Sequence, residues 1–177
     1  FLAIQAIDLD AGLLGEVVVQ RLIGLIVACR VDVEYRIRGT GNALANVLTG
    51  NAGNNVLTGG LGNDTLIGGL GGDTYVIDNA LDVVTEGASA GADLVKVGIA
   101  TAGGSYTLGA NLQNGTLINA VAFNLSGNEL NNILTGNAAA NVLDGGTGAD
   151  TLIGGAGNYI YVVENLGDVV TEASTVA

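Results

Sequence analysis

The chain has 177 residues with a formal net charge of −12; 30 residues are glycine, and proline, histidine, methionine and tryptophan are absent. Residues 39–177 hold 12 of the 17 acidic residues and only one basic residue, Lys96. This charge argues against nucleic acid, whose phosphates need cationic partners, and the lack of histidine excludes Ser-His-Asp and Cys-His catalysis.

Residues 1–38 are expected to form an N-terminal β-rich segment whose role the sequence does not assign. Within it, apolar residues alternate with charged ones, which predicts a half-buried strand, at Val31, Val33, Tyr35 and Ile37. The segment Val17–Val27 is either a strand pair or a short helix. The apolar stretch that ends at Cys29 is too short to span a bilayer, so no transmembrane segment is predicted. Cys29 is the single cysteine, and its apolar neighbours favour a buried structural thiol.

A nine-residue repeat begins at Gly41 and occupies most of the remaining chain. Its clearest copies are Gly59-Gly60-Leu61-Gly62-Asn63-Asp64-Thr65-Leu66-Ile67 and Gly68-Gly69-Leu70-Gly71-Gly72-Asp73-Thr74-Tyr75-Val76. The glycines allow positive φ, the Asp offers a hard oxygen ligand, and the last three residues favour a strand. The frame returns from Gly127 onward, and residues 41–86 and 127–172 are identical at 30 of 46 positions.

Each nonapeptide predicts a six-residue turn followed by a three-residue strand, so that two nonapeptides complete one coil. We therefore expect an all-β fold, a parallel β-roll or β-solenoid with two stacked arrays at residues 39–86 and 125–177. Position eight should point inward and form columns of Leu48 over Leu66, Leu57 over Tyr75, Leu134 over Leu152, and Leu143 over Tyr161. Residues 87–124 should form an irregular β connector with strands at Asp93–Ile99, Ser105–Leu108 and Thr116–Ile118, and with turns at Gly103-Gly104 and Asn114-Gly115.

The repeats resemble the RTX, or haemolysin-type calcium-binding repeat, family over roughly residues 39–177. The connector is similar to the linkers between RTX blocks in secreted lipases. The resemblance implies Ca²⁺ as the cofactor, with ligand roles for Asp64, Asp73 and Asp150 at position six. It also implies ligands from the turn backbone, at Gly59, Gly60, Gly62, Gly68, Gly69, Gly71, Gly145, Gly146 and Gly148. Calcium suits a cage of carbonyls and carboxylates, whereas zinc would favour Cys or His.

Several positions depart from the pattern or extend it. Asn46, Asn55 and Asn132 stand at position six with neutral oxygens, which should weaken their sites because ligand charge tunes calcium affinity. Asp82 and Asp168 fall in frame and either extend the ligand columns or face solvent. Tyr159 replaces the last Asp, and Ala139 replaces a position-four Gly where positive φ is expected. The pair of turns at 136–141 and 154–159 is therefore predicted to be empty or weak. Leu44 and Leu130 replace the same Gly in the first turn of each array, which favours a capping role.

Three functions are compatible with this sequence. The first is an extracellular calcium-binding RTX module, not itself an enzyme, that folds on binding calcium. By family resemblance, such modules belong to secreted or cell-surface proteins exported by type I secretion. The second is a structural component of a surface layer, matrix, filament or adhesin that self-associates end to end through open strand edges. The third is the C-terminal calcium-binding and secretion region of a secreted hydrolase.

Overall fold

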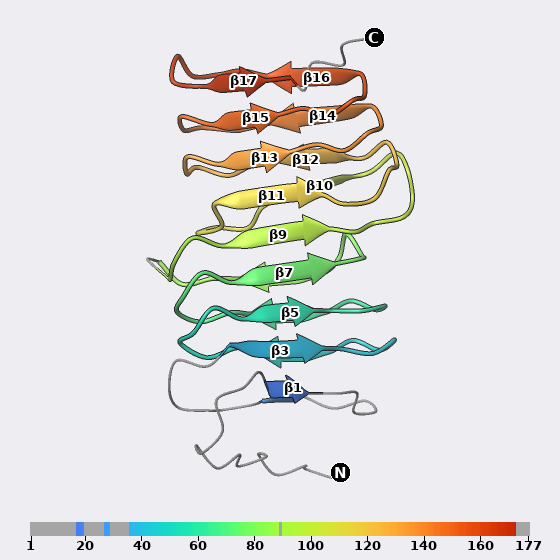
Figure 1. The fold of residues 1–177 in the computed structure, drawn as a ribbon, viewed down its shortest axis with the longest axis vertical. Coiled ribbons are helices and arrows are strands. Elements are labelled where there is room, and N and C mark those ends of the chain that lie inside the picture. Colours follow the sequence, from blue (N-terminus) through green and yellow to red (C-terminus); the bar gives the residue numbers. More distant parts are fainter. Residues whose placement is uncertain (1–16, 20–26, 29–35, 89, 173–177) are drawn as a thin grey trace.

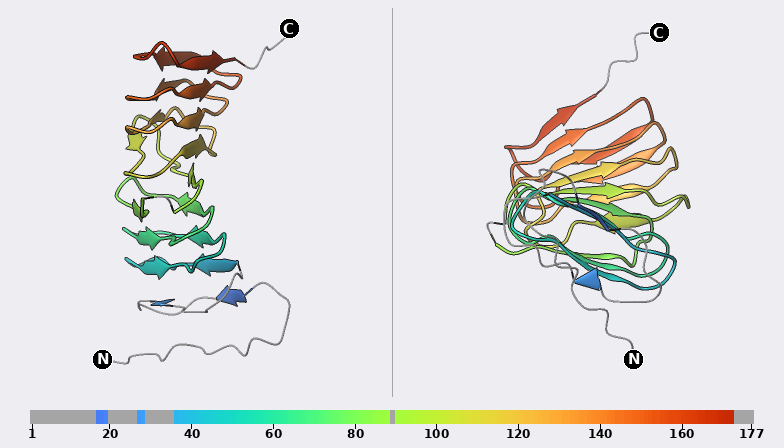
Figure 2. Two further views of the ribbon diagram at one scale, coloured as in Figure 1. Left: turned by 90° about the vertical axis from the view of Figure 1, so that its left-hand side faces the viewer. Right: turned by 60° about the horizontal axis from the view of Figure 1, so that its bottom comes forward.

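A computed structural model describes residues 17–19, 27–28, 36–88 and 90–172, which form a parallel β-solenoid. Successive strands stack along one axis, from β1 near the N-terminus to β17 near the C-terminus (Figure 1). Seen from the side, the strands lie in two facing layers (Figure 2). The described residues include no helix of the length and apolarity that a membrane span requires.

One layer is a single nine-stranded sheet. In stacking order its strands are β1 (Val17–Val19), β3 (Ile37–Thr40), β5 (Val56–Thr58), β7 (Thr74–Ile77), β9 (Leu94–Val97), β11 (Asn114–Leu117), β13 (Ile133–Thr135), β15 (Thr151–Ile153) and β17 (Val169–Thr171). The other layer consists of two four-stranded sheets. The first contains β2 (Val27–Ala28), β4 (Val47–Thr49), β6 (Thr65–Ile67) and β8 (Val83–Thr85), and the second contains β10 (Ser105–Thr107), β12 (Asn124–Ser126), β14 (Asn141–Asp144) and β16 (Tyr159–Val162).

The register of the strands confirms the predicted inward columns. Leu48 pairs with Leu66, Leu57 with Tyr75, Leu134 with Leu152, and Leu143 with Tyr161. The leucines of these columns are buried, and Tyr161 is half-buried. In β4, β5, β6 and β15 one buried leucine lies between two half-buried residues, because side chains in a strand point to opposite faces. Burying one leucine stabilises the fold by roughly 1.5–3 kcal/mol, so the core strengthens coil by coil.

The connector contributes coils to the same solenoid. The nine-stranded sheet runs without a break through β9 and β11, but the coil is longer there, since Asp73 and Asp93 occupy equivalent places 20 residues apart instead of 18. Strands at 94–97 and 105–107 lie where they were predicted. The prediction of a turn at Asn114-Gly115 was wrong, because both residues begin β11. Gly115 faces inward, and a Cβ there would lie 3.1 Å from the Leu125 side chain, so its neighbours fill the space it leaves.

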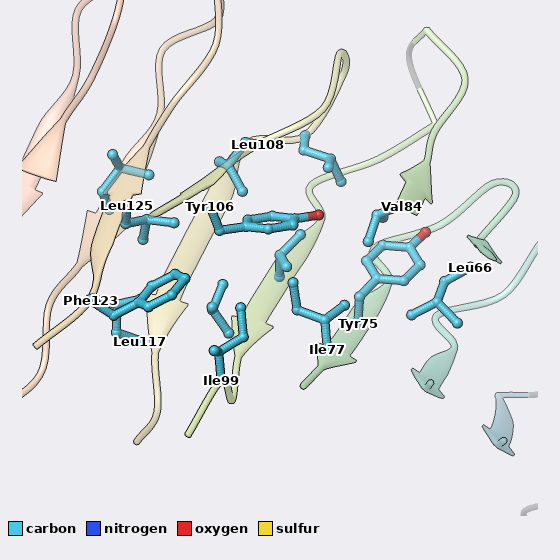
Figure 3. Close-up of a cluster of buried hydrophobic side chains, with 14 of the residues drawn as sticks. Leu66, Tyr75, Ile77, Val84, Ile99, Tyr106, Leu108, Leu117, Phe123 and Leu125 are labelled. Carbon is cyan, nitrogen blue, oxygen red and sulfur yellow. The ribbon is translucent and has the colours of Figure 1, made fainter. Parts of the chain in front are cut away.

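The second layer is interrupted where the first repeat block meets the connector. β8 ends one four-stranded sheet and β10 begins the next. Larger side chains fill the core on either side of this interruption, and Figure 3 shows Tyr75, Tyr106 and Phe123 among the aliphatic residues there.

The N-terminal predictions are tested only in part. Residues 17–19 and 27–28 form the strands β1 and β2, which pair with β3 and β4 in different sheets and not with each other. Ile37 is buried and Arg38 is exposed in β3, as the alternation predicted. Residues 20–26 and 29–35, including Cys29, lie outside the described residues.

Candidate metal centre

The turns of the solenoid are of two kinds, and the first kind has asparagine at positions two and six. In turn 41–46, Asn42 Oδ1 accepts a hydrogen bond from the Leu44 amide at 2.8 Å, and Asn46 Oδ1 accepts one from the Asn42 amide at 2.7 Å. The same pair of bonds recurs in the turns at 50–55, 127–132 and 136–141. In these Asn turns the side-chain Oδ1 atoms already have hydrogen-bond donors, because backbone amides of the same turn supply them.

The Asn turn also explains three departures from the glycine pattern. Leu44, Leu130 and Ala139 stand at position four, and none of them has positive φ. The expectation that Ala139 occupies a position needing positive φ was therefore wrong. In an Asn turn the side chain of position two holds the position-four amide, so an ordinary backbone conformation suffices.

The second kind of turn has aspartate at position six and left-handed glycines at positions two and four. The values of φ at position two are 82° at Gly60, 109° at Gly69 and 78° at Gly146, and at position four 122° at Gly62, 102° at Gly71 and 137° at Gly148. This conformation is strained for residues with a Cβ. Positive φ at these six glycines agrees with the prediction that the glycines of the repeat allow it, whereas the position-one glycines do not have positive φ.

The carboxylate of each Asp turn has one bound oxygen and one free oxygen. Asp64 Oδ1 accepts the backbone amide of Asn46 at 2.7 Å, and Asp150 Oδ1 accepts that of Asn132 at 2.7 Å. Asp73 Oδ1 accepts the amide of Asn55 at 2.6 Å. In all three, Oδ2 is buried and has no hydrogen-bond partner. The free oxygens face position one of their own turns, since a Cβ on Gly59 would lie 2.6 Å from Asp64 Oδ2 and those on Gly68 and Gly145 would come nearer still to the equivalent oxygens.

Backbone carbonyls of the preceding coil approach the same turns. A Cβ on Gly60 or on Gly62 would lie 2.8 Å from the carbonyl oxygen of Asn42 or Leu44, respectively. The equivalent carbonyls of Asn128 and Leu130 face Gly146 and Gly148 in the second block. Each Asp turn thus presents a free carboxylate oxygen and, from the neighbouring coil, backbone carbonyl oxygens, the hard donors that suit calcium.

Without a cation, these turns carry an energetic cost. A buried polar atom without a partner costs roughly 1–3 kcal/mol, and a charged one costs more. In each turn this cost is about as large as the stabilisation gained by burying one leucine. Burial raises the pKa of Asp64, Asp73 and Asp150, against the opposing effect of their amide hydrogen bonds. Neighbouring carboxylates raise it further, Asp82 and Asp78 acting on Asp64, and Asp168 and Asp144 acting on Asp150.

Comparison with known families agrees with this donor set. A model of the family described as the RTX calcium-binding nonapeptide repeat matches residues 40–75 and 126–161, with four copies. The chain carries RTX calcium-binding repeats. Its cofactor is Ca²⁺, and its fold is the β-roll of stacked nonapeptides. Comparisons with curated proteins and with solved structures gave no match.

Asp82 and Asp168 stand in frame with the RTX turns but have both oxygens engaged. Asp82 Oδ1 accepts the amide of Asp64, and its Oδ2 accepts the amides of Asp78 and Asn79. Asp168 makes the same bonds to Asp150, Glu164 and Asn165. The pKa of Asp168 is lowered, chiefly by the amide of Asp150 and then by that of Asn165. Both residues therefore resemble turn caps more than free ligands.

The turn at 154–159 lacks the features of an RTX calcium turn. Gly155 and Gly157 have no positive φ, and the Tyr159 hydroxyl donates to the carbonyl oxygen of Asn137. The Tyr159 ring stacks on that of Tyr161, with centroids 5.7 Å apart. The arrangement supports the prediction that this pair of turns binds calcium weakly or not at all.

Sequence reasoning missed two buried carboxylates near the end of the first repeat block, Glu86 and Asp93. Asp93 directly precedes β9, as Asp73 precedes β7, and its Oδ1 accepts the amide of Asp73 at 2.8 Å. The longer coil hid this equivalence, because the spacing of 18 residues between stacked turns, which still leads from Asp64 to Asp82, becomes 20 between Asp73 and Asp93. The signal that was present is an Asp at the start of the predicted strand Asp93–Ile99.

Proposed function

We propose that this chain is an extracellular calcium-binding RTX module that folds as calcium binds and is not itself catalytic. The observation that carries the proposal is the set of buried, unpartnered carboxylate oxygens on Asp64, Asp73 and Asp150. Stacking the Asp turns without a cation leaves these oxygens unsatisfied. The Asn turns need no cation, because local backbone amides donate to their side-chain oxygens. Calcium binding therefore contributes directly to the free energy of folding.

The charge of each RTX turn supports an extracellular setting. Asp64 and Asp150 each bring one free carboxylate oxygen, and the other candidate ligands are neutral carbonyls. Affinity for calcium rises with ligand charge, and extracellular calcium modules operate at roughly 10⁻⁴–10⁻³ M. Sites of this charge suit a medium rich in calcium. Within the family, such modules accompany type I secretion, and we extend that route to this chain.

Circular dichroism during a calcium titration tests the proposal. In chelator we expect a spectrum of unfolded chain, and with calcium in the millimolar range a β spectrum that appears cooperatively. Magnesium at the same concentration should have little effect, because it keeps its water shell and prefers a smaller octahedron. A full β spectrum in chelator at neutral pH would exclude calcium-coupled folding.

End-to-end self-association is the second candidate, and the last coil favours it. β16 and β17 are the terminal strands of their sheets among the described residues, and apolar side chains are exposed there, at Ile160, Val163, Val169 and Val170. Open strand edges with apolar faces pair readily with another chain. Light scattering in millimolar calcium distinguishes the candidates, since a filament or layer component grows with concentration and a separate module stays monomeric.

A further inference from the structure

A buried acidic cluster lies where the first repeat block meets the connector. Asp73 lies in the turn before β7, Glu86 directly follows β8, and Asp93 lies in the turn before β9. Their exposed fractions are 1%, 7% and 0%. One carboxylate oxygen from each lies within 4.8 Å of one from each of the others.

Each member of this junction cluster is fixed through one oxygen and keeps the other free. Asp73 Oδ1 accepts the backbone and side-chain nitrogens of Asn55, at 2.6 Å and 2.9 Å. Asp93 Oδ1 accepts the Asp73 amide, and Glu86 Oε1 accepts the Tyr75 hydroxyl. Asp73 Oδ2, Glu86 Oε2 and Asp93 Oδ2 are buried without a partner. The protein thus orients three carboxylates and leaves three oxygens unsatisfied.

Two of the three carboxylates, those of Asp73 and Glu86, lie beside Gly68. A Cβ on Gly68 would collide with the Tyr75 hydroxyl, Asp73 Oδ2 and Glu86 Oε1. Lys96 is the one basic residue in 39–177, and it lies on β9 between the inward-facing Val95 and Val97, so it faces outward, away from the buried cluster. Three like charges at this spacing repel strongly when water is excluded.

The geometry points to a divalent-cation site formed by Asp73, Glu86 and Asp93, with calcium as the ion. The donors are all hard oxygens, and three carboxylates give this site a higher ligand charge than any single Asp turn. Asp73 belongs to the Asp turn at 68–73, so the site shares this ligand with the repeat, whereas Glu86 and Asp93 lie outside both matched nonapeptide segments and extend the site beyond it. Because its ligands come from three coil segments, the ion would join the first repeat block to the connector. This inference rests on the proposed calcium-dependent folding.

The second repeat block provides an internal comparison. Tyr161 donates to Glu172 at 2.7 Å, as Tyr75 does to Glu86. Tyr159 stands in place of Asp73, however, and Glu172 is exposed. The Tyr–Glu pair is therefore present in both blocks, whereas the three-carboxylate cluster is found in one. Glu172 is a matched control for Glu86.

Equilibrium dialysis with calcium on the full chain tests the site. We expect Glu86→Gln and Asp93→Asn each to bind one ion fewer than the parent, and to need roughly tenfold more calcium for half-maximal folding. Glu172→Gln should match the parent in both measurements. Equal stoichiometry and midpoint in Glu86→Gln and Glu172→Gln would overturn the site.

Terbium provides a second measurement that does not depend on a variant losing stability. Terbium replaces calcium in oxygen cages, and its emission is sensitised by a nearby tyrosine. Tyr75→Phe keeps the buried ring and should abolish the part of the emission that Glu86→Gln also abolishes, whereas Tyr161→Phe should retain it. Emission that is unchanged in Tyr75→Phe would argue against an ion at the junction. If the parent chain shows no calcium-dependent folding, the proposed function itself fails; if it folds with calcium and Glu86→Gln behaves as the parent, only the junction site fails.

Discussion

The hydroxyl of Tyr159 donates a hydrogen bond to the backbone carbonyl oxygen of Asn137, one coil away. A Cβ on Gly136 would collide with the Tyr159 ring, and one on Gly155 would lie 2.7 Å from its hydroxyl. The phenol thus occupies the space between two stacked turns where the other repeat pairs hold the carboxylate of the position-six Asp. A protein hydroxyl here satisfies the carbonyl that an ion would otherwise attract.

Replacing this phenol should create a calcium turn. Tyr159→Asp restores position six, and Gly155 and Gly157 already stand at positions two and four, where they are free to adopt positive φ. We expect one additional calcium ion per chain by equilibrium dialysis. Tyr159→Asn supplies a neutral oxygen and should add no ion in the same calcium range. An unchanged stoichiometry in Tyr159→Asp would show that this turn cannot adopt the calcium conformation.

The two aspartates at the end of the second block should differ in their importance for calcium. Asp150 has a free buried oxygen, whereas both oxygens of the half-buried Asp168 accept amides. Asp150→Asn should lower calcium affinity about tenfold, or about 1.4 kcal/mol, as measured by calorimetry. Asp168→Asn should change affinity far less. Equal losses in the two variants would assign Asp168 a ligand role.

Alanine substitutions at two glycines should separate the cost of backbone strain from the cost of disturbing the stacked turns. Gly103 and Gly146 have similar φ, 85° and 78°, but a Cβ on Gly103 meets nothing within 4 Å, whereas one on Gly146 would lie 2.7 Å from the Asn128 carbonyl oxygen. Gly103→Ala should cost about 1–2 kcal/mol of unfolding free energy, the price of a left-handed alanine. Gly146→Ala should cost more and should also weaken calcium binding. Denaturant unfolding in millimolar calcium compares the two.

In chelator, the fold should be more stable in acid than at neutral pH. Burial, and then the charges of Asp93 and Asp73, raise the pKa of Glu86 from 4.5 to about 7. A raised pKa in the folded state contributes stability that is fully present below 4.5 and is lost as pH rises through about 7. Burial raises the pKa of Asp64, Asp73, Asp93 and Asp150 as well. These groups therefore also make the chelated fold more stable in acid than at neutral pH.

Circular dichroism in chelator between about pH 5 and pH 8 measures this effect. Secondary structure should be lost as pH rises, and Glu86→Gln should reduce the loss, because its side chain does not ionise. With calcium present the dependence should reverse, since protons compete with the ion for the carboxylates. A chelated protein whose spectrum is constant over this range would contradict the prediction.

The repeat frame predicted the local structure well because each nonapeptide contains its own turn and strand signals. The inward columns of Leu48 over Leu66 and of Leu134 over Leu152 follow from the period of nine and the alternation of a strand. The frame could not predict the connector, where the coil lengthens and Asn114-Gly115, a common turn dipeptide, becomes a strand. There the size of neighbouring core side chains, including Leu125, overrides the local preference.

By itself, the sequence determined the β-roll, the six left-handed glycines and the three Asp turns, since conformational freedom, strand preference and ligand type are local properties of each nonapeptide. Only the tertiary structure decided which carboxylate oxygens remain without a partner. Asp82 is in frame yet fully engaged, whereas Glu86 and Asp93 are out of frame yet gather beside Asp73. The reason is that an oxygen is satisfied or left free by amides and side chains of adjacent coils, about 20 residues away, and their placement depends on the length of every coil between them.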